Sequence, residues 1–237
     1  MAINPGALRG APERRFYTWA AVGAAVVVFA GFARTYYLKG VSGAPELPGL
    51  LHLHGVVMTL WFTLFLVQVR LVAGRRVDLH RRLGVVGALL AVLVLMVGVT
   101  TAIGGARRGA APALPPLVFL AVPLGDMLVF AGLVGAALWY RGRPGIHKRL
   151  MLLSSLSMLT AAIGRIPLEF IRTGGPLAFF GLTDLFIVAC VAFDTLKNRR
   201  LHPAFGWGGA LVVASQPLRL LLAGTPAWMK FATWLVA

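Results

Sequence analysis

The chain has 237 residues, of which 59% are hydrophobic and 13% are charged, and its mean hydropathy is +0.83. This composition excludes an ordinary soluble domain, in which about 25% of residues are charged. The formal net charge of +16 would favour nucleic-acid binding in a soluble protein. Here we expect the basic residues to meet anionic membrane lipid, and we expect no nucleic-acid partner.

Seven apolar stretches are long enough to cross a bilayer, whose roughly 30 Å hydrocarbon core needs about 20 helical residues. We place the spans at residues 16–38, 50–73, 83–104, 112–139, 150–171, 176–196 and 204–223. Stretches of this length are typical of helices and not of barrel strands. The predicted fold class is therefore all-α, a polytopic transmembrane bundle with seven spanning helices.

Three regions follow from these spans. Residues 1–15 are predicted to be a cytoplasmic tail, residues 16–223 the seven-helix domain and residues 224–237 a short apolar tail. The first span lacks a small-residue cleavage site before a hydrophilic region, so we interpret it as a retained helix. Aromatic residues at helical spacing in the C-terminal tail predict that it lies flat at the outer interface or docks onto another subunit.

The basic residues predict an orientation, because Lys and Arg are concentrated on the cytoplasmic side of membrane proteins. They gather in the N-terminal tail and in every second connector, at residues 70–82, 141–149 and 197–200. We therefore predict a cytoplasmic N-terminus, an outer C-terminus and a multi-pass protein of the bacterial inner membrane.

The second span carries the first candidate cofactor ligands. His54, Met58 and Trp61 follow one helical stripe, whereas His52 lies on another face. The two histidines therefore cannot easily share one metal ion on a regular helix. His54 is the better candidate for an axial haem ligand or a hydrogen-bond partner of a quinone.

Charged residues inside the spans carry further functional information, because burying a charge in hydrocarbon is costly. In this topology Arg165, Glu169, Asp184 and Arg219 fall in the outer half of the bilayer, and Asp126 falls near its middle. One hypothesis is an outward-facing pocket for an anionic or electron-rich group, with Glu169 able to pair with Arg165 or Arg172. The alternative is a set of interhelical ion pairs that hold the bundle together.

Two short segments at inward-facing helix starts are similar, DLHRRLGVVGAL and GIHKRLMLLSSL. They place His80 and His147 in equivalent positions and indicate a weak parallel repeat. These histidines are candidate ligands on the inner side, although solvated roles among basic residues are the simpler interpretation. Cys190 is the only cysteine, which excludes an intrachain disulfide or a site built from several thiolates. The identity of any metal stays open.

The chain resembles a group of uncharacterised bacterial inner-membrane proteins along most of its length. The matching segments are LHLHGVVMTLW, DLHRRLG, HKRLM, HPAFGWGG and SQPLRLLLAGTPAW. This resemblance implies a seven-helix integral membrane protein with H-[RK]-R-L elements and no established activity, so it supplies no catalytic residue.

The histidines also give an incomplete similarity to di-haem cytochromes of the b561 type. Those proteins hold one haem near each membrane face with two histidine pairs on four helices. This chain offers only His52 and His54 on the outer side, both from one helix. A single bis-histidine haem could form between His80 and His147, or His54 could act with a non-histidine or vacant second position.

These observations lead to three hypotheses of function. The first is a component of an electron-transfer or energy-transducing membrane complex that binds haem b or a quinone, with other membrane-protein subunits as partners. The second is a small-molecule or proton transporter in which Asp126 and Asp184 titrate. The third is a structural subunit that contacts partner helices, pigments or lipids. We expect no independent enzymatic activity, because no catalytic group stands at a familiar spacing.

Overall fold

A computed structural model describes residues 11–110 and 114–237 of the chain. Within these residues the secondary structure is helical, without strands, and the prediction of an all-α fold is confirmed for them. The elements are α2 (Ala11–Phe32), the π-helical η1 (Ala33–Tyr37), α3 (Lys39–Ser42), α4 (Gly49–Ala73), α5 (Val77–Arg107), α6 (Pro116–Phe119), α7 (Ala121–Trp139), α8 (Pro144–Leu156), α9 (Leu159–Ile163), α10 (Glu169–Asn198), α11 (Pro203–Ala223) and α12 (Pro226–Val236).

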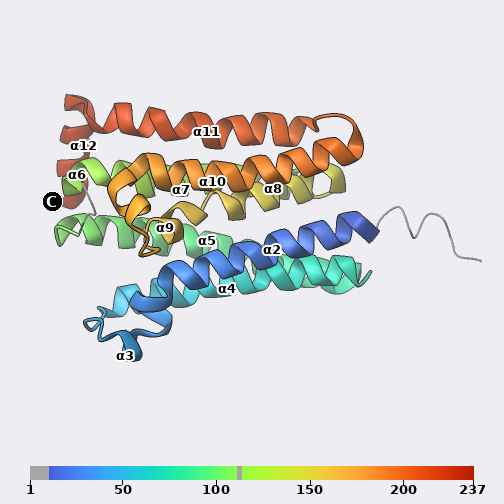
Figure 1. Ribbon diagram of the computed structural model, residues 1–237, viewed down its shortest axis with the longest axis horizontal. Helices are drawn as coiled ribbons and strands as arrows, with labels where there is room; N and C mark the ends of the chain where they lie inside the picture. Colours follow the sequence, from blue (N-terminus) through green and yellow to red (C-terminus); the bar gives the residue numbers. More distant parts are fainter. Residues whose placement is uncertain (1–10, 111–113) are drawn as a thin grey trace, which may run out of the picture.

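The long helices lie side by side along the longest axis of the molecule, as Figure 1 shows for α2, α4, α5, α7, α10 and α11. The start of α2 and the connections α4–α5, α7–α8 and α10–α11 lie together at one end, which we call the basic end. The short helices α3, α6 and α12 lie at the opposite end (Figure 1). The fold therefore gathers the predicted basic connectors at one end of the bundle.

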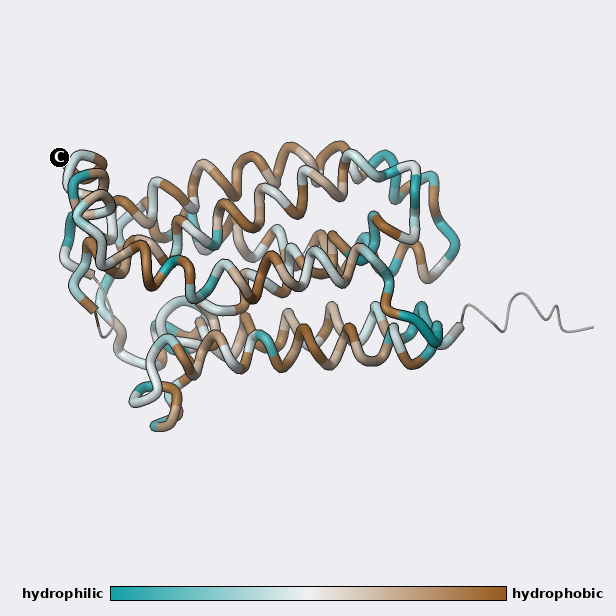
Figure 2. The backbone as a smooth tube through the Cα atoms, turned by 90° about the horizontal axis from the view of Figure 1, so that it is seen from above, coloured by the Kyte–Doolittle hydropathy of each residue, from teal (hydrophilic) through white to brown (hydrophobic). Residues whose placement is uncertain are grey.

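In the part of the chain that the structure describes, five helices have the length and the apolar composition of membrane spans: Pro12–Tyr37, Gly49–Ala73, Val77–Arg107, Pro116–Trp139 and Glu169–Asn198. Their outward surfaces are apolar as well. Val85, Leu89, Leu128 and Leu185 are between 64% and 75% exposed, and hydrophilic residues concentrate near the bundle ends (Figure 2). Large exposed apolar surfaces are typical of contact with lipid. These features indicate a membrane-embedded helical protein.

The predicted fifth span, residues 150–171, is not one continuous helix. Helix α8 ends at Leu156, α9 covers only Leu159–Ile163, and the backbone around Pro167 is not helical. Ser157 Oγ donates to Ser154 O at 3.0 Å, and Thr160 Oγ1 donates to Ser157 O at 3.0 Å. Such local bonds compete with the helical hydrogen-bond ladder, and proline removes one donor from it. Neither piece alone is long enough to count among the five spans.

This interrupted segment forms the centre of the bundle. Every residue from 152 to 160 is buried, and α8 and α9 contact α2, α7, α10 and α11. A segment that is enclosed by other helices does not face lipid, so it does not need the uniform apolar composition of an outer helix. The hydroxyls of Ser154, Ser157 and Thr160 are accommodated because they donate to backbone carbonyls within the segment, whereas Ser155 Oγ is buried without a partner among the described residues.

Helix α11 coincides closely with the predicted seventh span, residues 204–223. Its 21 residues reach about 31 Å at ~1.5 Å per residue, enough to cross the hydrocarbon core. It is not among the five apolar helices, and its second half contains Gln216, Pro217 and Arg219. The count of seven crossings therefore stays a prediction.

Helix α10 contains a sharp change of direction at Gly175. This residue has φ +50° and ψ −134°, a conformation that glycine adopts without the steric cost that a Cβ would impose. Pro176 follows it and begins the long straight part of the helix, at the residue where the predicted sixth span starts. The turn before Gly175 holds Glu169 and Arg172 at the end of the molecule opposite the basic end.

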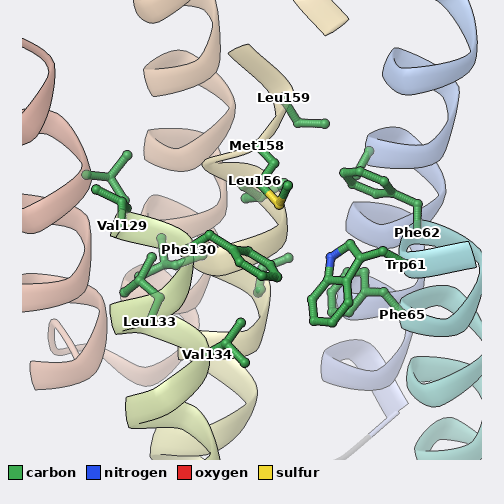
Figure 3. Packing of buried hydrophobic residues seen from close by; sticks show 14 of the residues in the cluster. Trp61, Phe62, Phe65, Val129, Phe130, Leu133, Val134, Leu156, Met158 and Leu159 are labelled. Atoms are coloured by element: carbon green, nitrogen blue, oxygen red, sulfur yellow. The ribbon is translucent and has the colours of Figure 1, made fainter. Parts of the chain in front are cut away.

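The main hydrophobic core joins α4 to α7 and to the central segment. Trp61 meets Phe130 edge to face, with ring centroids 4.9 Å apart. Figure 3 shows Trp61, Phe62 and Phe65 projecting from α4 toward the residues of α7 and of the α8–α9 segment. A smaller cluster joins Leu120, Ala121, Ala223, Trp228 and Ala232 at the far end.

The C-terminal tail forms α12, which runs across the bundle axis (Figure 1). Thr225 caps it by accepting from Trp228 N at 3.2 Å. Trp228 Nε1 donates to Leu117 O at 2.8 Å, and Arg107 Nε donates to Val236 O at 2.9 Å. The tail therefore packs onto its own chain while Trp234 remains exposed.

Candidate functional site

The two inner histidines lie next to each other at the basic end. His80 stands in the first turn of α5 and His147 in the first turn of α8. Their ring centroids are 6.2 Å apart, and the ring planes make an angle of 74°. The two similar sequence segments thus bring their equivalent residues together, although α6 and α7 lie between them along the chain.

The hydrogen bonds around this pair favour ligation by the ring nitrogens. His147 Nδ1 is 2.8 Å from Ala137 O, so a proton on Nδ1 is donated to this carbonyl and Nε2 is left with a free lone pair. Histidine ligands of metals commonly have this arrangement. His80 Nδ1 is buried and has no hydrogen-bond partner among the residues that the structure describes.

Gln68 of α4 completes the surroundings of the histidine pair. Its Nε2 donates to His80 O at 3.3 Å, while its Oε1 is buried without a partner. Buried polar atoms without partners are uncommon and call for an explanation such as an absent ligand or water. The cluster of His80, His147 and Gln68 is the candidate site that we develop below.

A second polar centre lies between α7 and α11. Arg219 Nη1 donates to Asp126 Oδ1 at 2.5 Å, and both side chains are buried. Arg219 Nη2 also donates to Ser215 Oγ at 2.8 Å, and the guanidinium lies 5.8 Å from the ring centre of Phe180. Nearby, Gln216 Nε2 donates to Asp184 Oδ1 at 2.7 Å. These contacts agree with the alternative in which the charges form interhelical pairs.

Arg165 and Glu169, near the end of the α8–α9 segment, contact different partners. Arg165 Nη1 donates to Ala161 O at 2.7 Å, and its guanidinium stands 4.9 Å from the ring centre of Phe32. Glu169 pairs with Arg172 at 3.2 Å, and both of these side chains are exposed. Of the two arginines that Glu169 could reach, the structure thus selects Arg172.

Helix α4 lies on the other side of the bundle from α11, the helix that carries Arg219 (Figure 1). Within residues 11–110 and 114–237, the Nδ1 atom of the half-buried His54 has no hydrogen-bond partner, and neither has the Nε1 atom of the buried Trp61. Met58 is partly buried and packs against the core. His52 is exposed on another face, with its ring 6.1 Å from that of Tyr36.

The proposed outer pocket is therefore not assembled from all of its predicted members. Asp126 and Arg219 face each other across α7 and α11, Asp184 faces Gln216, and His54 lies on α4. Helical periodicity predicts on which face of its helix each side chain lies. The packing of the helices placed these faces in different interfaces.

Sequence reasoning missed one buried ion pair. Arg149 Nη2 donates to Asp194 Oδ1 at 2.6 Å, its Nε donates to Asp194 Oδ2 at 3.0 Å, and both side chains are buried. Arg149 Nη1 also donates to Gly145 O at 2.7 Å. The available signal was Asp194 itself, an acidic residue inside a predicted span, because such residues are rare there and usually paired.

Two recesses open at the basic end. One has a volume of about 340 Å³ and is lined by Glu13, Lys148, Arg149, Asn198, Arg200 and His202. In this recess Lys148 Nζ donates to Glu13 Oε1, and His202 Nδ1 accepts from Ala204 N at 3.2 Å as the cap of α11. Burial, together with the nearby charge of Arg149, lowers the pKa of His202. The other recess has a volume of about 600 Å³ and lies between α2 and α4.

Comparisons with models of protein families, with curated proteins and with solved structures found no match. The functional argument therefore depends on the chemistry of the residues described above. Within the described residues, no three His, Cys, Asp or Glu side chains are grouped so that they could hold a metal ion by themselves. The pair His80 and His147 would consequently need most of the coordination sphere to come from a cofactor.

Proposed function

We propose that this protein is a haem b-binding electron-transfer component of a bacterial inner membrane, with the haem between His80 and His147. The observation that carries the proposal is the 6.2 Å separation of the two ring centroids. A metal–imidazole bond is about 2 Å long, and a ring nitrogen lies roughly 1.1 Å from its ring centre. Two imidazoles on opposite sides of one metal ion therefore have ring centres about 6 Å apart.

The surroundings of the histidines fit a haem in two further respects. The hydrogen bond from His147 Nδ1 to Ala137 O leaves Nε2 free for the iron. Arg81 and Arg82 follow His80, so cations that can balance the propionates stand beside this ligand, whereas Lys148, which follows His147, is paired with Glu13. A porphyrin supplies the four nitrogen ligands that two histidines lack. When bound, it would supply one-electron redox chemistry.

The topology that we propose has seven crossings, a cytoplasmic N-terminus and an outer C-terminus. It is supported by the basic connectors gathered at one end of the bundle (Figure 1) and by the length of α11. In this arrangement the α8–α9 segment is a crossing that other helices enclose. The histidine pair then lies near the cytoplasmic face, as expected for the inner-side haem of a b561-type bundle.

The test of the haem proposal is the absorption spectrum of protein purified in mild detergent from cells supplied with a haem precursor. We expect a Soret band and the sharp α-band of a reduced low-spin haem. His80→Ala and His147→Ala should each lose the low-spin spectrum, because each removes one axial ligand. His52→Ala is the matched control, since His52 is exposed and makes no contact with the pair.

The result that would contradict the proposal is purified, folded protein without a Soret band, both as isolated and after addition of haem. An equal loss of haem in the His52→Ala variant would contradict the assignment of the ligands. Electron paramagnetic resonance tests the ligands independently of absorbance. The wild type should show the g-values of a low-spin, bis-histidine haem, and either single variant should show a high-spin signal instead.

A second ligand, a quinone, is favoured by two buried atoms on α4. His54 Nδ1 and Trp61 Nε1 lack partners, and Trp61 is only 3% exposed. An indole N–H can donate to a quinone carbonyl, and an imidazole can exchange a proton with the reduced form. Extraction of purified protein with organic solvent should yield quinone from the wild type and less from Trp61→Phe. Equal yields from both proteins would contradict this second proposal.

A further inference from the structure

The larger recess at the basic end lies between the start of α2 and the end of α4. It has a volume of about 600 Å³ and is lined by Arg14, Arg15, Thr18, Trp19, Arg70 and Ala73. We propose that this recess binds the phosphate headgroup of an anionic phospholipid. The proposal does not depend on haem binding.

The lining of the recess is strongly cationic. Exposed guanidinium groups of Arg15 and Arg70 come from two different helices, and among the described residues no carboxylate lines the recess. Glu13 is adjacent in sequence, but its carboxylate contacts Lys148 and lies 3.6 Å from Lys197 Nζ, on the side of α2 that faces α8 and α10. Glu13 therefore does not balance the charges of Arg15 and Arg70, and an anion is their complementary ligand.

Helical spacing directs the lining residues toward a shared space. Arg15 and Trp19 are one turn apart on α2, and Arg70 and Ala73 are one turn apart on α4. Arg15 and Arg70 are both exposed, so their guanidinium groups are accessible from outside the bundle. Arginine can bind a phosphate with two parallel hydrogen bonds.

The position of Trp19 favours a lipid over a soluble phosphate. Its side chain is 71% exposed, and tryptophan prefers the headgroup level of a membrane. Further along the same face of α2, Val26 and Phe29 are exposed as well. An acyl chain can therefore extend along apolar side chains while its phosphate remains at the arginines. Basic pockets at helix ends on the cytoplasmic side are a common site for anionic headgroups.

The experiment is native mass spectrometry of the full chain, titrated in detergent with phosphatidylglycerol or with phosphatidylcholine of the same acyl chains. For the wild type we expect at least tenfold tighter binding of one phosphatidylglycerol than of phosphatidylcholine. The double variant Arg15→Gln/Arg70→Gln should bind phosphatidylglycerol at least tenfold more weakly, because it removes the two exposed guanidinium groups that would bind the phosphate. Arg141→Gln/Arg143→Gln is the matched control, with the same loss of charge at the same end of the bundle.

Three outcomes would overturn the proposal. They are equal binding of the two lipids to the wild type, an equal loss of binding in the control variant, and binding of inorganic phosphate as tight as that of phosphatidylglycerol. Both altered arginines are exposed, so we expect the double variant to fold. If it does not fold, Arg70→Gln alone supplies the measurement, and an affinity equal to that of the wild type would contradict the site.

Discussion

At the scale of single residues, Arg219 reaches Asp126 because Gly125 leaves room for it. A Cβ at Gly125 would overlap the Cδ of Arg219. The long side chain of Arg219 thus lies flat against α7, and its charge meets the carboxylate of Asp126 in a buried interface. A buried ion pair of this kind contributes to specific helix pairing as long as both partners are present.

The first prediction concerns this ion pair. Asp126→Asn should lower the free energy of unfolding by about 3 kcal/mol, because the buried charge of Arg219 then lacks its counter-ion. Asp184→Asn is the control and should cost about 1 kcal/mol or less, since its partner Gln216 is neutral. The measurement is reversible unfolding of the purified protein by denaturant in detergent micelles.

The double variant Asp126→Leu/Arg219→Met separates a structural role from a proton-carrying one. If the pair is structural, the double variant should recover most of the stability that Asp126→Asn loses, because no uncompensated charge remains. A double variant that is as unstable as the single variant would contradict this interpretation.

The second prediction concerns His202 and pH. Its Nδ1 accepts from Ala204 N, so protonation removes the cap of α11. Because burial makes its pKa lower in the folded state than the unfolded value near 6.5, this stability is present above about pH 6.5. It is lost as the pH falls through the folded-state pKa.

The measurement is the melting temperature in detergent at pH 7.5 and at pH 5.5, compared between the wild type and His202→Asn. Asparagine caps helices well and does not titrate. The melting temperature of the variant should therefore fall less on acidification than that of the wild type. Equal losses in the two proteins would show that other groups cause the pH dependence.

At the scale of elements, the interrupted α8–α9 segment depends on close packing against α2. Gly31 lies so near α9 that a Cβ there would overlap the carbonyl of Ala162. Small residues allow membrane helices to approach closely, which strengthens packing where no hydrophobic effect drives association. The short helix α9 is therefore held in place largely by its neighbours.

The third prediction follows from this contact. Gly31→Ala should destabilise the protein by about 1–3 kcal/mol, because α2 and α9 must separate to admit the methyl group. Gly132→Ala on α7 is the control. Its Cβ would meet no atom within 4 Å, so alanine should be neutral or slightly stabilising. The same unfolding measurement in detergent compares both variants, and equal stability of the two would contradict the close packing.

At the scale of the whole molecule, the charge distribution separates the two ends of the bundle. The basic end holds the connectors at residues 74–76, 140–143 and 199–202, whereas α12 covers the opposite end. The exposed Trp19 and Trp139 lie at the basic end, and the exposed Trp234 lies in α12. Aromatic residues at both ends match the two interfaces of a bilayer, and the apolar surfaces between them match its hydrocarbon core.

The fourth prediction concerns the orientation of the molecule. A cysteine introduced at Gly142 should react with a membrane-impermeant maleimide only after cell lysis, and one introduced at Ala237 should react on intact spheroplasts. The native Cys190 is buried and should give little background in either case. Labelling of both positions from the same side would mean an even number of crossings between them, and would contradict the seven-crossing topology.

Part of the candidate site could be predicted from the sequence. His80 and His147 stand in similar segments, and these segments suggested a shared role before their proximity was known. Which predicted members of the outer pocket lie together could not be predicted, because helical spacing assigns a face to His54 or Arg219 but not the neighbour of that face. The ion pair between Asp194 and Arg149 was missed because Arg149 could not be distinguished in the sequence from the other basic residues of its connector.

The sequence by itself determined that this protein is helical, membrane-embedded and basic at alternating connectors. It could do so because a bilayer forces backbone hydrogen bonds to close within each segment, so length and composition are local signals. Only the tertiary structure decided that the fifth segment breaks at its centre, that Asp126 pairs with Arg219 and that the two histidines meet. These features depend on how the helices rotate and pack against each other, and contacts between distant residues set that rotation.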